Sequence, residues 1–233
     1  MIRASKISKK IGDKTILKDI DLEIPDGRFL AVLGPNGAGK TTLMKILSLL
    51  NKPTSGSLEI NGEEVGENQS AFRRQIGVVS HQTFLYNHLT AFENLAFYGR
   101  MYEVPRLRER ISQVMEEVGL QYVLGDPVRT FSRGMQQRLA IARAILHSPA
   151  ALFLDEPYTG LDQHAVEILN QVLLGLQNQQ RTVILVTHNF DQGLNLCDQA
   201  VIMVKGQLAH QAGREEFMAR DFKQVYLRCV EGS

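Results

Sequence analysis

Every second residue from Ile20 to Ile24 is apolar, and the residues between them are charged. This alternation predicts a half-buried strand. Farther along, the segment 57–60 is followed by Asn61 and Gly62, which predicts a strand that runs into a tight turn. The first third of the chain is therefore expected to consist largely of strands.

Continuous apolar runs indicate a second kind of strand, buried on both faces. These runs cover residues 29–33, 151–154, 182–186 and 200–204. A helix is predicted after the first run, from about Gly39 to Leu50, and another over 163–178. Strands that alternate with helices favour an α/β fold with a mainly parallel, doubly wound sheet.

The middle of the chain has helical periodicity from 90 to 146. Apolar residues recur there at helical spacing, at Leu107, Ile111, Val114, Met115 and Val118. This spacing leaves Arg110 and Glu117 on the outer face of the predicted helix, and Gly119 is expected to end it. We expect one domain over 1–233, with a core of about 1–82 and 148–233 and a helical subdomain of about 83–147.

The composition and charge of the chain argue against some classes of function. The chain has 233 residues, 44% of them hydrophobic, and a formal net charge of +1. No basic arm or acidic tail occurs, so no nucleic-acid partner is expected. No stretch approaches the ~20 apolar residues of a transmembrane helix, so a transport function would need a pore from another chain. Cys197 and Cys229 show no CxxC spacing and are interpreted as reduced thiols.

A glycine-rich segment between the first buried run and the predicted helix matches the pattern G-x-x-x-x-G-K-[ST]. It reads Gly34, Pro35, Asn36, Gly37, Ala38, Gly39, Lys40 and Thr41. Glycines let backbone N–H groups surround phosphates, and the helix N-terminus adds a positive dipole end. We expect Lys40 to reach the β- and γ-phosphates of a nucleotide, Thr41 to bind Mg²⁺ and Thr42 to contact an inner phosphate.

The apolar run at 151–154 ends in two carboxylates, Asp155 and Glu156. Asp155 can hold Mg²⁺, and Glu156 can orient or deprotonate an attacking water. Many strands end in acidic residues at a loop, so this pair gains its meaning from the phosphate loop upstream. Together the two motifs predict a phosphate-loop NTPase.

A third segment lies between these motifs and indicates the kind of NTPase. It reads Phe131, Ser132, Arg133, Gly134, Met135, Gln136, Gln137 and Arg138. It resembles the signature of ATP-binding-cassette (ABC) ATPases, usually Leu-Ser-Gly-Gly-Gln followed by x-Gln-Arg. Arg133 and Met135 replace the usual Gly and Gln. The alternative is an ordinary Ser-capped helix, but the position ahead of Asp155 favours the signature.

Two further segments resemble ABC ATPases in the expected order. Residues 159–162 resemble the D-loop, with Asp162 as its acidic residue, and His188 stands where the family keeps a histidine that contacts the γ-phosphate. The resemblance implies an ABC ATPase core with N-terminal antiparallel strands and a helical subdomain. It also implies a homodimer joined head to tail through ATP, in which Ser132 and Gly134 face the partner's nucleotide.

Two places depart from the family pattern. Ile11 stands where the family has an aromatic residue that stacks on adenine, and an aliphatic side chain covers a base without π overlap. In the glutamine loop, an ungapped comparison places His81 at the expected position, and a shift of one residue places Gln82 there. Gln82 is favoured, because its amide oxygen can bind Mg²⁺ and its NH₂ can bond the water.

The resemblance also implies a membrane permease as partner, on the cytoplasmic face of the inner membrane. Phe84, Leu85 and Tyr86 follow the glutamine loop, either as a docking patch for the permease or as core of the helical subdomain. The segment 80–86 and the signature resemble the haem-exporter ATPase of cytochrome c maturation. The alternatives are another two-component exporter, for drugs or lipids, and a soluble ABC ATPase of DNA repair or translation.

Overall fold

The computed structural model describes residues 1–66, 69–178, 180–219 and 222–231. The strands are β1 (Ile2–Ile11), β2 (Lys14–Ile24), β3 (Phe29–Leu33), β4 (Ser55–Ile60), β5 (Glu63–Glu64), β6 (Ile76–Val79), β7 (Ala151–Asp155), β8 (Thr182–Val186), β9 (Gln199–Val204) and β10 (Gln207–Gly213). The α-helices are α1 (Lys40–Leu47), α2 (Ser70–Arg73), α3 (Ala91–Met101), α4 (Leu107–Glu117), α5 (Arg133–Ile145), α6 (Gln163–Asn178), α7 (Phe190–Leu196), α8 (Arg214–Ala219) and α9 (Phe222–Glu231). Short 3-10 turns cover Gln121–Val123 and Val128–Thr130.

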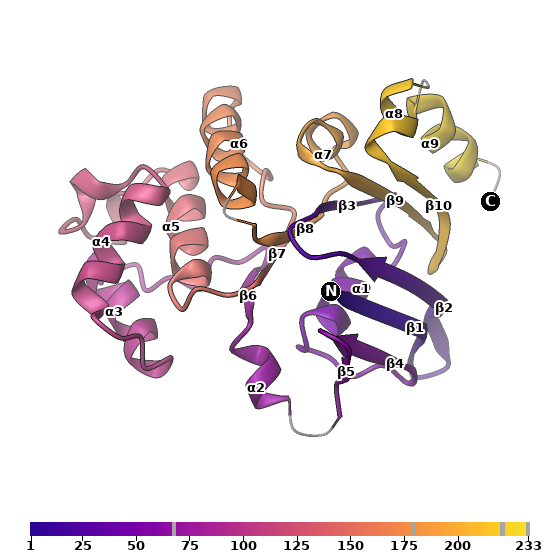
Figure 1. The fold of residues 1–233 in the computed structure, drawn as a ribbon. Coiled ribbons are helices and arrows are strands. Elements are labelled where there is room, and N and C mark those ends of the chain that lie inside the picture. Colours follow the sequence, from indigo (N-terminus) through magenta and orange to yellow (C-terminus); the bar gives the residue numbers. More distant parts are fainter. Residues whose placement is uncertain (67–68, 179, 220–221, 232–233) are drawn as a thin grey trace.

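The strands form two sheets. The larger has the order β10-β9-β3-β8-β7-β6, and all its neighbours pair in parallel except β9 and β10. The smaller is antiparallel, with the order β2-β1-β4-β5. The predicted α/β class, with a mainly parallel sheet and N-terminal antiparallel strands, is confirmed. Helices α3, α4 and α5 gather on the side of the molecule away from the antiparallel sheet (Figure 1).

Strand β3 shows why the apolar runs are continuous. Successive side chains of a strand point to opposite faces, and this sheet is covered on both. Phe29 and Leu33 join the apolar cluster that includes α5 and α6, whereas Leu30 and Val32 join the cluster beneath α1 and the antiparallel sheet. Burial on both faces holds these strands in place. Their carboxyl ends therefore position the polar motifs that follow, such as the glycine-rich loop after β3 and Glu156 after β7.

Local signals mark several element boundaries. Thr90 caps α3 in a reciprocal capping box with Glu93, and Gly119, with φ of 65°, follows the end of α4 as predicted. The turn at Asn61 and Gly62 has positive φ at both residues, as a tight hairpin requires. The first predicted helix is shorter than expected, because α1 ends at Leu47 and the chain then turns.

The outer face predicted for α4 is wrong at two positions. Arg110 and Glu117 form an ion pair of 3.0 Å and are only 16% and 20% exposed. Arg181, from the segment before β8, pairs with the same carboxylate at 3.3 Å. Arg110 also donates to the carbonyls of Ile145 and Leu146. This network joins α4 to α5 and to the sheet.

Two sequence expectations concern the whole chain. Among the described residues, none of the helices combines the length and apolarity needed to span a bilayer. Both cysteines are free thiols, and burial raises the pKa of Cys197 to about 12, so that thiol stays protonated at neutral pH.

Candidate functional site

The phosphate loop runs from the end of β3 to the start of α1, as the motif predicts. Gly39 is the N-cap of α1 and has φ of 98°, a conformation that favours glycine. A Cβ on Gly39 would lie 2.8 Å from Cδ2 of Leu17 and 3.1 Å from the carbonyl oxygen of Ile16. Only glycine therefore fits where the loop passes under β2.

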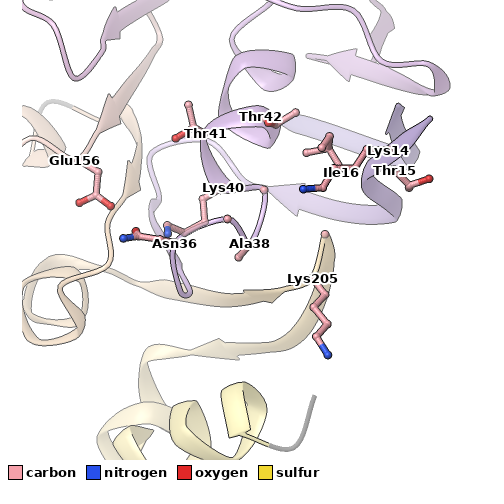
Figure 2. Close-up of a pocket in the computed structure, with 13 residues that line it drawn as sticks. Lys14, Thr15, Ile16, Asn36, Ala38, Lys40, Thr41, Thr42, Glu156 and Lys205 are labelled. Carbon is pink, nitrogen blue, oxygen red and sulfur yellow. The ribbon is translucent and has the colours of Figure 1, made fainter. Parts of the chain in front are cut away.

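This loop forms one wall of a cleft of about 570 Å³. The cleft is lined by Lys14, Thr15, Ile16, Asn36, Gly37, Ala38, Gly39, Lys40, Thr41, Thr42, Glu156, Lys205 and Gly206. Figure 2 shows Glu156 on one side of the loop, and Lys14 and Lys205 on the other. Most residues of the predicted phosphate loop thus face one cavity at a helix N-terminus, which suits a polyphosphate.

Lys40 is folded back onto its own loop. Its ammonium donates to the carbonyl oxygens of Gly34 at 2.8 Å and Pro35 at 3.1 Å, and the residue is only 6% exposed. Desolvation lowers the pKa of Lys40, while the charges of Glu156 and Asp155 act in the opposite direction. The ammonium of Lys40 is thus held by neutral oxygens in the wall of the cleft, where a bound anion could replace them.

Thr41 and Asp155 meet although they come from distant parts of the chain. The Thr41 hydroxyl donates to Oδ1 of Asp155 at 3.1 Å. Burial raises the pKa of Asp155, and the hydrogen bond from Thr41 opposes this rise. Mg²⁺ prefers hard oxygen ligands such as hydroxyl and carboxylate oxygens. The adjacent side chains of Thr41 and Asp155 provide one of each and therefore fit that ion.

Glu156 is held by the end of β8. Its backbone N–H donates to the carbonyl of Val186, and its φ of 51° is unusual for a residue other than glycine. One carboxylate oxygen accepts a hydrogen bond of 3.2 Å from the Thr187 hydroxyl and lies 2.9 Å from Nδ1 of His188. The predicted base and the predicted histidine are therefore in direct contact, and strained backbone at such a point is typical of functional sites.

The signature lies apart from this cleft, since none of Ser132, Arg133, Gly134 and Met135 is among the residues that line it. Ser132 caps α5, and its oxygen accepts a hydrogen bond from the N–H of Met135 at 3.2 Å. Ser132 therefore acts as the N-cap of α5, the alternative to a signature role. Because its oxygen is the acceptor in this bond, its hydroxyl can still donate a hydrogen bond to another group. Asp162 likewise accepts from the N–H of Ala165 at the start of α6.

Two predicted residues stand away from the cleft. Ile11 is 60% exposed at the end of β1, and neither it nor Gln82 is among the lining residues. Gln82 is exposed, and its carbonyl accepts from the Ser80 hydroxyl. His81 is close enough for its charge to lower the pKa of Asp155, a minor cause beside burial. Of the two glutamine-loop candidates, His81 rather than Gln82 is therefore the one whose charge acts on Asp155.

Sequence reasoning missed several site residues. Thr187 is buried and bonded to Glu156, and its signal was a hydroxyl placed directly at the end of an apolar run. Ile16 and Gly206 line the cleft from the β2 hairpin and the β9–β10 turn. The N–H of Gly206 donates to the carbonyl of Ala38 in the phosphate loop. No local motif marks these two positions.

Comparison with known proteins decides the family. The model of the family described as ABC transporter matches residues 17–159. The chain belongs to the ABC transporter ATP-binding family. YdbJ of Bacillus subtilis (strain 168), an uncharacterised ABC transporter ATP-binding protein, is 38% identical over 203 residues, 87% of this chain and 66% of YdbJ.

Other members of the ABC family resemble the chain over a similar span. The spermidine/putrescine import ATP-binding protein PotA of Haemophilus ducreyi is 36% identical and covers 93% of the chain, which spans 59% of PotA. The linearmycin resistance ATP-binding protein LnrL of B. subtilis is 35% identical, over 89% of this chain and 68% of LnrL. The chain thus spans about two thirds or less of YdbJ and PotA.

A solved structure of an ABC ATPase shares the fold. The ATP-binding cassette MJ0796, in a dimeric post-hydrolysis state bound to ADP and Pi, superposes with a TM-score of 0.81. It is 27% identical, and the match covers 92% of this chain and 99% of that one. The ABC ATPase fold expected from the sequence is therefore confirmed.

Proposed function

We propose that this chain hydrolyses ATP as one half of a head-to-tail homodimer that drives a separate membrane permease. The observation that carries the proposal is the separation of two groups of side chains. Thr41 and Glu156 line the cleft and contact Asp155 and His188, respectively, whereas none of the signature residues lines this cleft. A second copy, paired as in a nucleotide sandwich, would bring its signature to the open side. The dimeric MJ0796 structure supports such pairing.

Each side chain then has a role. The residues Asn36 to Thr42 hold the phosphates by their N–H groups, while Gly34 and Pro35 shape the start of the loop, and Lys40 exchanges its carbonyl partners for phosphate oxygens. Thr41 and Asp155, with Gln82 or His81, would hold Mg²⁺, which neutralises phosphate charge when bound. Glu156 takes or orients the proton of the attacking water, and His188 fixes that carboxylate and contacts the γ-phosphate.

Replacement of the base tests this assignment. Glu156→Gln keeps the shape and the bond from Thr187 but removes the proton acceptor, so turnover should fall by roughly 10²–10⁴-fold. ATP binding should persist, and the variant should accumulate as an ATP-bound dimer in size-exclusion chromatography. Hydrolysis near the wild-type rate, or a monomer at saturating ATP, would contradict the proposal.

The permease would dock beside the glutamine loop. Phe84 and Tyr86 are 60% and 48% exposed, whereas Leu85 is half-buried against the apolar core. Leu85 therefore packs on the core, while Phe84 and Tyr86 are exposed and available for docking. Arg143 of α5 anchors it by donating to the carbonyls of Thr83 at 2.6 Å and Phe84 at 3.3 Å. Exposed aromatic side chains on a firmly held loop are suited to seat a helix of a partner.

A charge on the exposed side chain tests the docking surface. Phe84→Glu should cost little stability and should block co-purification with the permease, because an unpaired carboxylate in an apolar groove is unfavourable. Tyr122→Glu is the matched control, since Tyr122 is an aromatic residue that is 92% exposed, in a 3-10 turn outside the segment 84–86. Equal loss of the permease in both variants would argue against this surface.

For the cargo we propose haem export in cytochrome c maturation, at the cytoplasmic face of the inner membrane. The support is the resemblance of segment 80–86 and of the signature to that exporter's ATPase. Deletion of the gene should abolish haem-stained c-type cytochromes, and a Lys40→Ala copy should fail to restore them. Normal levels of c-type cytochromes in the deletion strain would contradict haem export. The ATPase of another exporter would then be the alternative, which the similarity to LnrL favours. A gain in sensitivity to toxic amphipathic compounds would then identify drug export.

A further inference from the structure

Arg133 occupies the signature position where the ABC family usually has glycine, and its side chain has a specific partner. Its Nε donates to the carbonyl oxygen of Thr159 at 2.7 Å. Thr159 belongs to the D-loop segment, which lies between β7 and α6. Arg133 therefore ties the N-terminus of the signature helix to the D-loop of the same chain.

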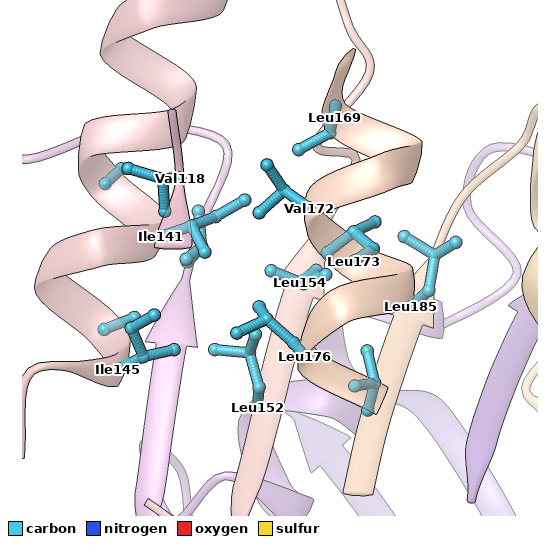
Figure 3. Close-up of a cluster of buried hydrophobic side chains, with 14 of the residues drawn as sticks. Val118, Ile141, Ile145, Leu152, Leu154, Leu169, Val172, Leu173, Leu176 and Leu185 are labelled. Carbon is cyan, nitrogen blue, oxygen red and sulfur yellow. The ribbon is translucent and has the colours of Figure 1, made fainter. Parts of the chain in front are cut away.

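The backbone around this bond is shaped for it. Gly160 has φ of 75°, and a Cβ there would lie 2.7 Å from Nε and 3.2 Å from Cζ of Arg133. A Cβ on Gly134 would lie 2.9 Å from Cβ of Ala165 in α6. Farther along, α5 and α6 share one apolar core against β7 and β8 (Figure 3). The two helices thus meet closely, and the Arg133 side chain lies flat over the glycine.

The D-loop end of this link leads directly to the candidate base. The N–H of Thr159 donates to the carbonyl of Glu156 at 3.2 Å. Two hydrogen bonds therefore connect Arg133 to the backbone of Glu156. That backbone holds an unusual positive φ, so the direction of its carboxylate is sensitive to the turn that follows it.

We propose that Arg133 is a positioning residue that couples the two nucleotide sites of the dimer. The inference rests on the proposed function, in which the signature of one chain contacts the nucleotide of its partner. Engagement of Ser132 and Gly134 at the partner's nucleotide fixes the N-terminus of α5. Arg133 then fixes Thr159, and Thr159 sets Glu156 at the chain's own nucleotide. Each site becomes competent when the other is filled.

Two substitutions of similar length separate the hydrogen bond from the charge. In Arg133→Gln, the amide nitrogen takes the place of Nε and can still donate to Thr159, but the charge is lost. In Arg133→Met, both the donor and the charge are lost. Arg129→Met is the matched control, because Arg129 is also an exposed arginine, in the 3-10 turn just before α5.

The readout is ATP hydrolysis by the full chain as a function of ATP concentration. Wild type, Arg129→Met and Arg133→Gln should have Hill coefficients that approach ~2, the number of sites in the dimer. Arg133→Met should fall to ~1, with at least about a threefold lower rate at saturating ATP, while binding of a fluorescent ATP analogue to the monomer stays the same. Those results together would support the coupling role.

Other results overturn the inference. A Hill coefficient in Arg133→Met equal to that of wild type would show that the bond carries no coupling. Equal losses in the Gln and Met variants would show that the charge acts directly on the partner's nucleotide. A wild-type coefficient of ~1 with normal ATP-driven dimerisation would also exclude coupling and leave the proposed function standing. Absence of both dimerisation and hydrolysis in wild type would overturn the proposed function itself.

Discussion

The hydroxyl of Thr41 donates a hydrogen bond of 3.1 Å to Oδ1 of Asp155, a residue 114 positions later in the chain. The bond joins the first turn of α1 to the end of β7. It also places a carboxylate where burial raises its pKa, so that the charged form destabilises the fold. A group needed for chemistry is therefore expected to be unfavourable for stability.

Asp155→Asn should stabilise the nucleotide-free protein at neutral pH and abolish magnesium-dependent hydrolysis. The amide oxygen can still accept from Thr41, while the buried charge is removed. Each kcal/mol gained should raise the Tm by about 2–4 °C in a chain of this length. Calorimetry of the variant checks this, with Asp13→Asn, at an exposed turn, as the control. A Tm equal to or below that of wild type would contradict the expectation.

The stability gain should also depend on pH in a defined direction. The folded state holds the Asp155 proton more tightly than the unfolded state, because the pKa is raised above its ordinary value of 3.8. Wild type therefore carries the full penalty only above the raised pKa. As the pH falls through that pKa toward 3.8, the carboxyl becomes neutral and the Tm difference between wild type and variant should disappear.

Thr187 and His188 should differ in their effects on turnover, although both contact the same carboxylate oxygen. Thr187→Val removes one neutral hydrogen bond, worth about 0.5–1.5 kcal/mol, so kcat should fall only a few-fold. His188→Ala removes a group that is also proposed to contact the γ-phosphate, and kcat should fall roughly 10²-fold or more. Single-turnover kinetics with unchanged ATP binding would check both. The reverse order of effects would make Thr187 the more important partner.

Ser132→Arg should prevent dimerisation while the monomer still binds ATP, because in the proposed dimer the added side chain would face the partner's nucleotide. It is a cleaner variant than Gly134→Asp, since any side chain at Gly134 would also press on Ala165 of α6. Mixing Ser132→Arg with Lys40→Ala subunits gives one composite site with both defects and one with neither. The mixture should therefore regain part of the activity that neither variant has alone. A mixture as inactive as its components would contradict the head-to-tail pairing.

The two glutamine-loop candidates can be separated in the same assay. If Gln82 supplies a magnesium ligand, Gln82→Ala should raise the magnesium concentration needed for half-maximal hydrolysis by about tenfold, on the order of one lost ligand contact. His81→Ala should change it little. The proximity of His81 to Asp155 makes the opposite result informative, because it would assign the position to His81.

The sequence was most informative where one short segment determines both structure and chemistry. The strand β3, the glycines after it and the capped start of α5 were all predictable, because local conformation and the motif coincide there. Long-range pairing was not predictable. The register of β1 and β2 shifts between Lys9 and Lys10 and leaves Ile16 unpaired, and Ile16 rather than Ile11 lines the cleft. The inward turn of Arg110 depends on Glu117 and Arg181, and periodicity within one helix cannot show a partner beyond it.

The segment after the glutamine loop shows the same limit at closer range. Phe84, Leu85 and Tyr86 all have large, mainly apolar side chains, yet only Leu85 packs against the core. Phe84 has a positive φ of 50°, which reverses the local direction of the chain. That conformation is held by Arg143 and by the hydroxyl of Tyr98, both of which donate to the Phe84 carbonyl from other helices. Neither could be read from the segment itself.

The folded-back position of Lys40 has a consequence for the heat of nucleotide binding. A long side chain that is mobile before binding loses roughly 1.5–2 kcal/mol of conformational entropy when it is immobilised. In this structure the ammonium is already bonded to Gly34 and Pro35, so its rotamers are restricted before ATP arrives. Phosphate binding should then exchange neutral carbonyl acceptors for anionic ones and appear in calorimetry mainly as favourable enthalpy. Lys40 is therefore already ordered before the nucleotide binds, and the entropic cost of ordering it is not part of the binding free energy.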